Sequence, residues 1–369
     1  MFLLLCLYDC PKIKGRRIKL QYVLVLSTFA SEFKSYKYKH SLHYTLSISE
    51  FTTMEHFRFI FLSSFLYVIL LVGVFASEDV SWETYWQSAL PKTPIPQAVQ
   101  ELLHPENWPG TEGKRTYTGI SKDALNINTI QSGSAFPTAG PESYAKAATG
   151  KIPVEQDVTT FFFEKDLHLG KKMTLHFPKT TNNAKFLPRL VARAQPFSSS
   201  KLPEILNRFS LKPESAEAEI VKQTIEECEE PSIEGEDKYC ATSLESLVDF
   251  SVSKLGKYAE VFSTKVDGEN KQEYRIARRV EKIGERSVVC HKQKYVYAVF
   301  YCHEIRSTRA YKVSLVGADG TKAEAVAVCH SDTRKWNIKL LAFQLLKVKP
   351  GTVPICHFLP SGNLLWVPN

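Results

Sequence analysis

The stretch VCHKQKYVYAVFYCHEI, residues 289–305, contains the dipeptide Cys-His twice. Two further copies follow toward the end of the chain, so that the four are Cys290-His291, Cys302-His303, Cys329-His330 and Cys356-His357. Cysteine and histidine are scarce here, with 8 and 10 copies among 369 residues, so four adjacent pairs indicate a specific requirement. The pairs either form one metal site or assign the two residue types to separate tasks.

The region around the pairs has the composition of β-strands, because segments such as 295–301 combine β-branched and aromatic residues. Neighbouring side chains of a strand point to opposite faces of the sheet. The Cys and His of one pair therefore cannot easily bind one ion together, and zinc motifs accordingly place several residues between their ligands. We predict that the cysteines form disulfides on one face while the histidines stand on the other.

Each histidine, taken alone, has an ordinary interpretation as a surface or hydrogen-bonded residue beside a structural disulfide. Four histidines at matched positions instead favour a metal site, because clustered imidazoles bind Cu(II), Zn(II) or Ni(II). With the thiols engaged in disulfides, an imidazole site with open coordination positions favours copper over structural zinc.

The beginning of the chain has the layout of a secretory signal peptide that is preceded by an extension. Met54 opens a segment with one positive flank, and the apolar run 59–76 ends in small residues suited to signal-peptidase cleavage. The alternative is a membrane span, for which 18 residues are just long enough. We expect a signal peptide over 54–76, a spurious or processed extension over 1–53, and a secreted protein with no membrane contact after cleavage.

Removing residues 1–76 changes both the charge and the cysteine count. The formal charge falls from +8 to about +3, since 38 Lys and Arg then face 35 Asp and Glu, and this mild balance argues against a nucleic-acid partner. Six cysteines remain, which favours disulfides in a secreted chain but leaves fifteen pairings open. Cys228 and Cys240 flank an acidic loop, and we expect them to pair with each other.

Helical patterns precede the β-rich region. Residues 77–108 are predicted to be a short leader and 109–158 a flexible linker rich in small residues. Helices are expected in 198–211 and 214–230, and a third is expected to begin at a capping box of Thr242 and Glu245 and to end at Gly256. A hairpin is predicted to turn at 318–320. The predicted fold class is α+β, with helices followed by a mostly antiparallel, disulfide-stapled β-rich core over 159–369.

The spacing CH-x10-CH-x25-CH-x25-CH resembles the signature of the plant BURP domain. The likeness extends to the phenylalanines within Phe161–Phe163, EKDLHLGKKM after them, CATSLESLVDF at 240–250, and CHFLP with WVP at the end. It covers residues 159–369. The linker shows no tandem repeats, which resembles the seed-protein and microspore-protein types of this family.

Some BURP proteins are copper-dependent autocatalytic peptide cyclases, which crosslink a core peptide of their own chain through Trp or Tyr with dioxygen. The resemblance implies copper as the cofactor and an own-chain or other peptide as the substrate. It implies these ligands: His291, His303, His330 and His357, with His168 and His176 as further candidates. The disulfide residues would be Cys228, Cys240, Cys290, Cys302, Cys329 and Cys356.

This sequence departs from the cyclase pattern, because no convincing core peptide is present. Gln131 is followed by its first aromatic hydroxyl only at Tyr144, and Gln100 with Trp108 lies in the leader. Other members of the family have only cell-wall, seed or stress associations. The alternative is therefore a non-enzymatic extracellular-matrix, cell-wall or seed-compartment protein whose partner is a wall polysaccharide.

Overall fold

The computed structural model describes residues 81–103, 125, 158–177, 184–232, 234–305 and 307–369. The predicted extension and signal peptide, and the predicted linker except Leu125 and Val158, lie outside these residues. The α-helices are α3 (Trp82–Ala89), α4 (Gln97–Gln100), α7 (Arg189–Arg193), α8 (Leu202–Arg208), α9 (Ala216–Glu229), α10 (Leu244–Leu255) and α11 (Leu341–Leu346), with 3-10 turns η2 (Glu164–Asp166) and η3 (Ser199–Lys201).

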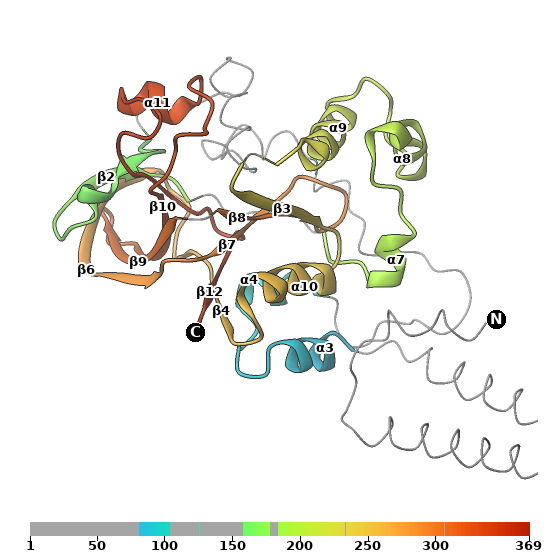
Figure 1. Cartoon of the computed structure of the whole chain (residues 1–369), viewed down its shortest axis with the longest axis horizontal. Coiled ribbons are helices and arrows are strands. Elements are labelled where there is room, and N and C mark those ends of the chain that lie inside the picture. The colour runs from blue at the N-terminus through green and yellow to red at the C-terminus, as the bar shows by residue number, and fades with distance from the viewer. Residues whose placement is uncertain (1–80, 104–124, 126–157, 178–183, 233, 306) are drawn as a thin grey trace, which may run out of the picture. The chain divides into compact units, whose positions relative to one another are not determined.

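Twelve strands form two antiparallel sheets in the described part of the chain (Figure 1). The first has the order β1-β11-β10-β9-β6-β2, with β5 also pairing with β10, and the second has the order β3-β8-β7-β12-β4. The strands are β1 (Phe162–Phe163), β2 (Lys172–Leu175), β3 (Glu236–Ala241), β4 (Ala259–Phe262), β5 (Lys265–Val266), β6 (Gln272–Gly284), β7 (Val288–Lys292), β8 (Phe300–Ile305), β9 (Thr308–Gly317), β10 (Lys322–His330), β11 (Ile355–Phe358) and β12 (Leu364–Pro368). The predicted α+β class with a β-rich core is confirmed.

The seven-stranded sheet curls around its own apolar core (Figure 1). That core contains Phe177, Tyr274, Phe358 and the paired Cys329 and Cys356. The chain entering β1 lies beside the opposite edge of the sheet, because the Thr159 amide donates to the Thr174 carbonyl at 2.7 Å. The hairpin of β9 and β10 turns at the predicted position, where Gly320 adopts a positive φ of 90°.

The five-stranded sheet is covered on one face by α10 and α3. Trp366 of β12 and the disulfide-bonded Cys290 and Cys302 belong to this core. The predicted capping box of α10 is wrong by one residue: Ser243 is the N-cap, and Ser246 makes the reciprocal contact. Thr242 still belongs to the extended chain that leaves β3, so Ser243 is the first residue placed to cap. Gly256 ends the helix as predicted, with φ +84°.

The segment predicted to be a leader packs into the same core. Trp86 is 1% exposed, contacts Trp366 at a ring-centroid distance of 5.9 Å, and donates from Nε1 to the Thr93 carbonyl. Val99 and Leu102 are also buried in this core. The folded core thus extends beyond the residues to which sequence reasoning confined the domain.

The expectation that 295–301 is a strand is wrong for its first five residues. β8 begins only at Phe300, and residues 295–299 form a fully buried loop. Tyr295 and Tyr297 lie there among side chains of α8 and α9, together with Leu125 from the predicted linker. The β-like composition of this loop therefore reflects burial rather than strand pairing.

Another apolar cluster joins the two sheets. It contains Val289 of β7 and Leu365 of β12 from one sheet, and Val326 and Val328 of β10 from the other. Side chains two residues apart share a face of a strand. His291 therefore shares a face with Val289, and His330 shares one with Val328, which places both histidines on the side where the sheets meet.

Candidate metal centre

The six cysteines form three disulfides, as predicted, and the structure resolves their pairing. Cys290 lies directly opposite Cys302 on β7 and β8, with Cα atoms 3.9 Å apart. Cys329 lies opposite Cys356 on β10 and β11, with Cα atoms 4.0 Å apart. The third bond is Cys228–Cys240, the pair expected from the sequence. Each of the first two bonds fixes the register of two neighbouring strands.

The histidine that follows each cysteine points to the opposite face and meets a partner there. His291 and His303 bring their Nε2 atoms to 3.2 Å. His330 and His357 do the same at 3.3 Å. The prediction of divided faces is confirmed: the structure brings the four predicted residues together as two pairs with the same local arrangement.

All four imidazoles are buried, with 3% to 4% of each residue exposed. Burial lowers the pKa of His291 and of His330 well below the usual value, and it lowers the pKa of His357 to about 4. A positive charge on His303, His357 or His330 would lower the pKa of His291 further. Neutral imidazole is the form that binds metal ions.

The Nδ1 atoms of the first pair have side-chain partners. His303 Nδ1 lies 2.7 Å from Glu236 Oε1, and the Glu236 residue is 7% exposed. His291 Nδ1 lies 3.1 Å from Asn363 Nδ2, while Asn363 Oδ1 accepts from the Lys292 amide at 3.0 Å. Glu236 is on β3 and Asn363 precedes β12. Sequence reasoning missed both, because neither is near a Cys-His pair in the chain.

The second pair is held differently. His357 Nδ1 lies 3.2 Å from the Phe358 carbonyl oxygen. His330 Nδ1 is buried without a hydrogen-bond partner in the described residues. Aromatic rings enclose this pair, with Trp336 against His330 at a centroid distance of 4.9 Å and Phe161 against His357 at 6.3 Å.

In each pair, two imidazole Nε2 atoms lie within 3.3 Å of each other. Among the residues that the structure describes, no group of three or more His, Cys, Asp or Glu side chains has the arrangement of a metal site. The described residues also contain no helix long and apolar enough to cross a membrane.

The other two candidate ligands lie elsewhere in the chain. His168 is exposed in the turn before β2, and its Nδ1 is 3.1 Å from the Leu169 carbonyl oxygen. His176 is buried directly after β2. A ligand role for either residue stays a prediction.

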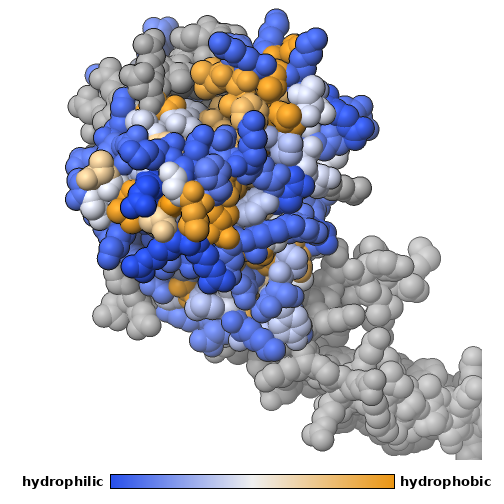
Figure 2. Space-filling view, turned by 90° about the vertical axis from the view of Figure 1, so that its left-hand side faces the viewer, coloured by the Kyte–Doolittle hydropathy of each residue, from blue (hydrophilic) through white to orange (hydrophobic). Residues whose placement is uncertain are grey.

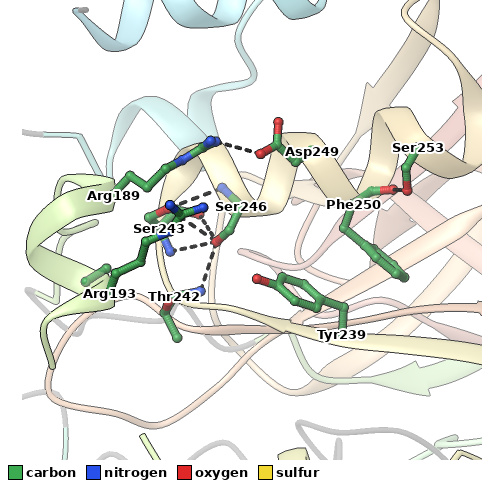
Figure 3. Close-up of a pocket in the computed structure, with 10 residues that line it drawn as sticks. Arg189, Arg193, Tyr239, Thr242, Ser243, Ser246, Asp249, Phe250 and Ser253 are labelled. Carbon is green, nitrogen blue, oxygen red and sulfur yellow. Dashed lines mark hydrogen bonds and ion pairs between the residues drawn. The ribbon is translucent and has the colours of Figure 1, made fainter. Parts of the chain in front are cut away.

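A separate cavity of about 320 Å³ opens between α7, β3 and the start of α10 (Figure 3). Tyr239, 44% exposed, stacks on Phe250 at its edge with ring centroids 5.5 Å apart. Arg189 lines it but is paired with Asp249 at 2.7 Å, and the serine hydroxyls at the start of α10 bond to one another. The cavity offers an aromatic surface and hydroxyl groups, together with the charged side chains of Arg193 and Asp249.

The face formed by the curled sheet is mainly hydrophilic, with separate hydrophobic patches (Figure 2). Exposed large apolar side chains include Leu169 and Ile338, each 62% exposed, which lie in different parts of the chain. Scattered residues of this kind are normal on a protein surface. They give no second candidate site.

The profile of the BURP domain matches residues 160–368. The chain is 53% identical over 234 residues to BURP domain-containing protein 3 of Oryza sativa subsp. japonica, a match that spans 61% of this chain and 54% of that protein. It is 48% identical over 386 residues to BURP domain protein RD22 of Arabidopsis thaliana, spanning 81% of this chain and 98% of that protein. BURP domain-containing protein 5 of rice is 44% identical over 78% of this chain and 87% of its own length.

Proposed function

Because this chain belongs to the BURP-domain family of plant proteins, we propose that it binds copper through its two histidine pairs and serves in oxidative crosslinking of a peptide. The resemblance found from the Cys-His spacing is thereby confirmed at the level of the family. The seed-protein or microspore-protein type, the metal and the reaction stay predictions.

The observation that carries the proposal is the approach of two Nε2 atoms at each pair, to 3.2 and 3.3 Å. Two nitrogens at these separations are close enough for both to bind one ion, since metal–imidazole bonds are about 2.0 Å long. Without a metal the same separation suits an N–H···N hydrogen bond, so metal binding must be measured.

The surrounding residues fit a metal-ligand role. Ligating histidines usually donate their second ring N–H to a carboxylate or a backbone carbonyl, which fixes the tautomer. Glu236 stands in that position for His303, and the Phe358 carbonyl does so for His357. Trp336 and Phe161 cover the second pair and limit its contact with water. Copper, when bound, would supply one-electron oxidation with dioxygen.

The proposed substrate is a peptide of the chain itself or another peptide, since the sequence contains no convincing core peptide. Val158 begins the described domain only three residues before Phe161, whose ring contacts His357. The chain therefore enters this described segment close to the second histidine pair. We also propose that the protein is secreted, because the apolar run 59–76 has the layout of a signal peptide.

The proposal is tested on the processed protein purified after secretion of the full chain. Copper per chain is measured by mass spectrometry after loading with Cu(II) and removal of excess metal, and the site is characterised by EPR. We expect bound copper that falls when His291 and His303 are both replaced by Ala. The variant Leu190→Ala is the control, since Leu190 is 69% exposed and its side chain carries no metal-binding atom, and it should keep its copper.

Copper near zero in the wild type, or copper unchanged in His291→Ala/His303→Ala, would refute the metal proposal. Crosslinking is measured separately on the same samples. Each crosslink removes two hydrogen atoms from the peptide with dioxygen as the oxidant, and the mass of the intact chain reports it. If copper is bound but the mass does not fall in air, the copper-binding proposal stands and the proposal of cyclase activity is refuted.

A second candidate function, polysaccharide binding without catalysis, is favoured by the cavity beside α10. Exposed aromatic rings with nearby hydroxyl groups suit the apolar and polar faces of a sugar ring. Pectic polysaccharide retained in the presence of a chelator, and lost in Tyr239→Ala, would support this function. If Tyr239→Ala retains as much polysaccharide as the wild type, the cavity is not the polysaccharide-binding site.

A further inference from the structure

The two histidine pairs differ in what lies behind them. Behind His303 stands the buried carboxylate of Glu236, 2.7 Å from Nδ1. Behind His357 stands a neutral backbone carbonyl, and behind His330 no hydrogen-bond partner lies within the described residues. The local backbone arrangement of the two pairs is alike, so the Nδ1 partners distinguish the pairs, together with the aromatic rings of Trp336 and Phe161 that cover the second pair.

These partners set the tautomers. A carboxylate oxygen and a carbonyl oxygen only accept hydrogen bonds, so His303 and His357 each donate from Nδ1 and keep the lone pair on Nε2. That lone pair faces His291 in one pair and His330 in the other. Each pair therefore contains one imidazole that is already oriented as a ligand.

The two sites would carry different charge when a divalent cation binds. Placing a cation in a buried site is costly unless an opposite charge compensates it. The pair on β7 and β8 has the Glu236 carboxylate in direct contact with His303. In the same pair Asn363 Nδ2 donates to His291 Nδ1, so that His291 must release its Nε2 proton before this nitrogen binds a cation. The pair on β10 and β11 has only the carbonyl, and an Nδ1–H on His330 would be buried without an acceptor among the described residues.

We infer that the chain holds two unequal copper sites and that Glu236 is the positioning residue that makes the His291–His303 pair the tighter one. This inference rests on the proposed copper function. Loss of a partner behind a metal ligand typically weakens metal binding by about 10-fold to 100-fold. Glu236→Gln keeps an oxygen acceptor for His303 but removes the charge, so it isolates the electrostatic contribution.

The matched control is Glu304→Gln. Glu304 is also 7% exposed and follows His303 directly, but it points to the other face and pairs with Arg286 at 2.6 Å. Copper titrations with a competing chelator should resolve two binding events in the wild type. Glu236→Gln should weaken the tighter event by about 10-fold to 100-fold and leave the weaker one unchanged. Glu304→Gln should change neither event.

A second comparison does not depend on the folding of Glu236→Gln. His330→Ala/His357→Ala should abolish the weaker event, and His291→Ala/His303→Ala the tighter one, with EPR of the first bound equivalent following the same assignment. A tight site that survives loss of His291 and His303 would overturn the inference, as would a single event that needs all four histidines. An unaltered tight event in folded Glu236→Gln would also overturn it. No copper in the wild type would instead refute the proposed function.

Discussion

The packing of residues 81–103 makes a quantitative prediction for Trp86→Ala. The Trp86 side chain is 1% exposed, packs on Trp366, and donates to the Thr93 carbonyl. Removing about 200 Å² of buried apolar surface corresponds to about 5 kcal/mol, and measured Trp-to-Ala changes in cores cost about 3–5 kcal/mol. Since domains are stable by about 5–15 kcal/mol, this single change would remove a large share of the folding free energy.

Equilibrium urea unfolding with intact disulfides, followed by near-UV circular dichroism, measures the effect. With a slope of about 3 kcal/mol/M, the urea midpoint should fall by at least about 1 M. Leu190→Ala is the control, because Leu190 is 69% exposed on neighbouring α7 and its loss should change stability by less than about 0.5 kcal/mol. A loss below about 1 kcal/mol in Trp86→Ala would refute the claim that this segment belongs to the core.

The same reasoning applies after the chain is cut. A site for a sequence-specific protease, introduced between residues 108 and 124, would separate the segment that contains Trp86 from the rest of the domain. We expect the two pieces to elute together from a gel-filtration column, because Trp86, Val99 and Leu102 are buried in the shared core. Separation of the wild-type pieces under native conditions would contradict this expectation. Separation only in Trp86→Ala would confirm that the buried Trp86 holds the cleaved segment on the domain.

Three further outcomes follow from particular contacts. Replacing Cys329 and Cys356 by Ser opens a loop of 27 residues and should lower the free energy of unfolding by about 3.5 kcal/mol in urea titrations; a loss no larger than that of an exposed substitution would contradict it. Arg309 lowers the pKa of Glu164 by hydrogen bonding, so Glu164 stabilises the fold above its unfolded pKa, and this contribution is lost as pH falls through the lowered folded pKa. Glu164→Gln should therefore flatten the acid limb of a stability–pH curve, and an unchanged limb would argue against the ion pair. Gly256→Ala places a side chain at φ +84° and should cost about 1–2 kcal/mol by thermal unfolding, an expectation contradicted by an unchanged melting temperature.

Local features of the sequence predicted the elements that local physics determines. Gly320 and Gly256 require backbone conformations that glycine adopts easily, and both the hairpin turn and the helix end lie where the sequence places them. The opposite faces of Cys290 and His291 follow from strand alternation alone. These predictions needed no knowledge of the tertiary fold.

Features set by distant contacts could not be read in the same way. The disulfide pairing depends on which strands are neighbours, and Glu236 reaches His303 only because β3 pairs with β8. Trp86 carries no signal that distinguishes a docked segment from a detached one. The loop 295–299 has strand-like composition, yet its backbone bonds outside any ladder, as when the Ala298 amide donates to the Lys185 carbonyl.

The unequal spacing of four identical dipeptides has a geometric explanation. When two cysteines lie directly opposite on antiparallel strands, the residues after them lie diagonally on the other face, as His291 opposite Tyr301 and His303 opposite Val289. Diagonal neighbours are about 7–8 Å apart, which two long side chains can span. Only the disulfide and the strand alternation determine this meeting, so the loop between the strands is free to differ.

That independence accounts for ten residues between the first two dipeptides and twenty-five between the last two. The first interval joins β7 to β8 through a buried loop, and the last joins β10 to β11 through α11. The middle interval, from His303 to Cys329, carries the chain from one sheet to the other. The dipeptide thus builds the same pair twice, once in each sheet, and the apolar cluster between the sheets holds the strands that carry the two pairs against each other.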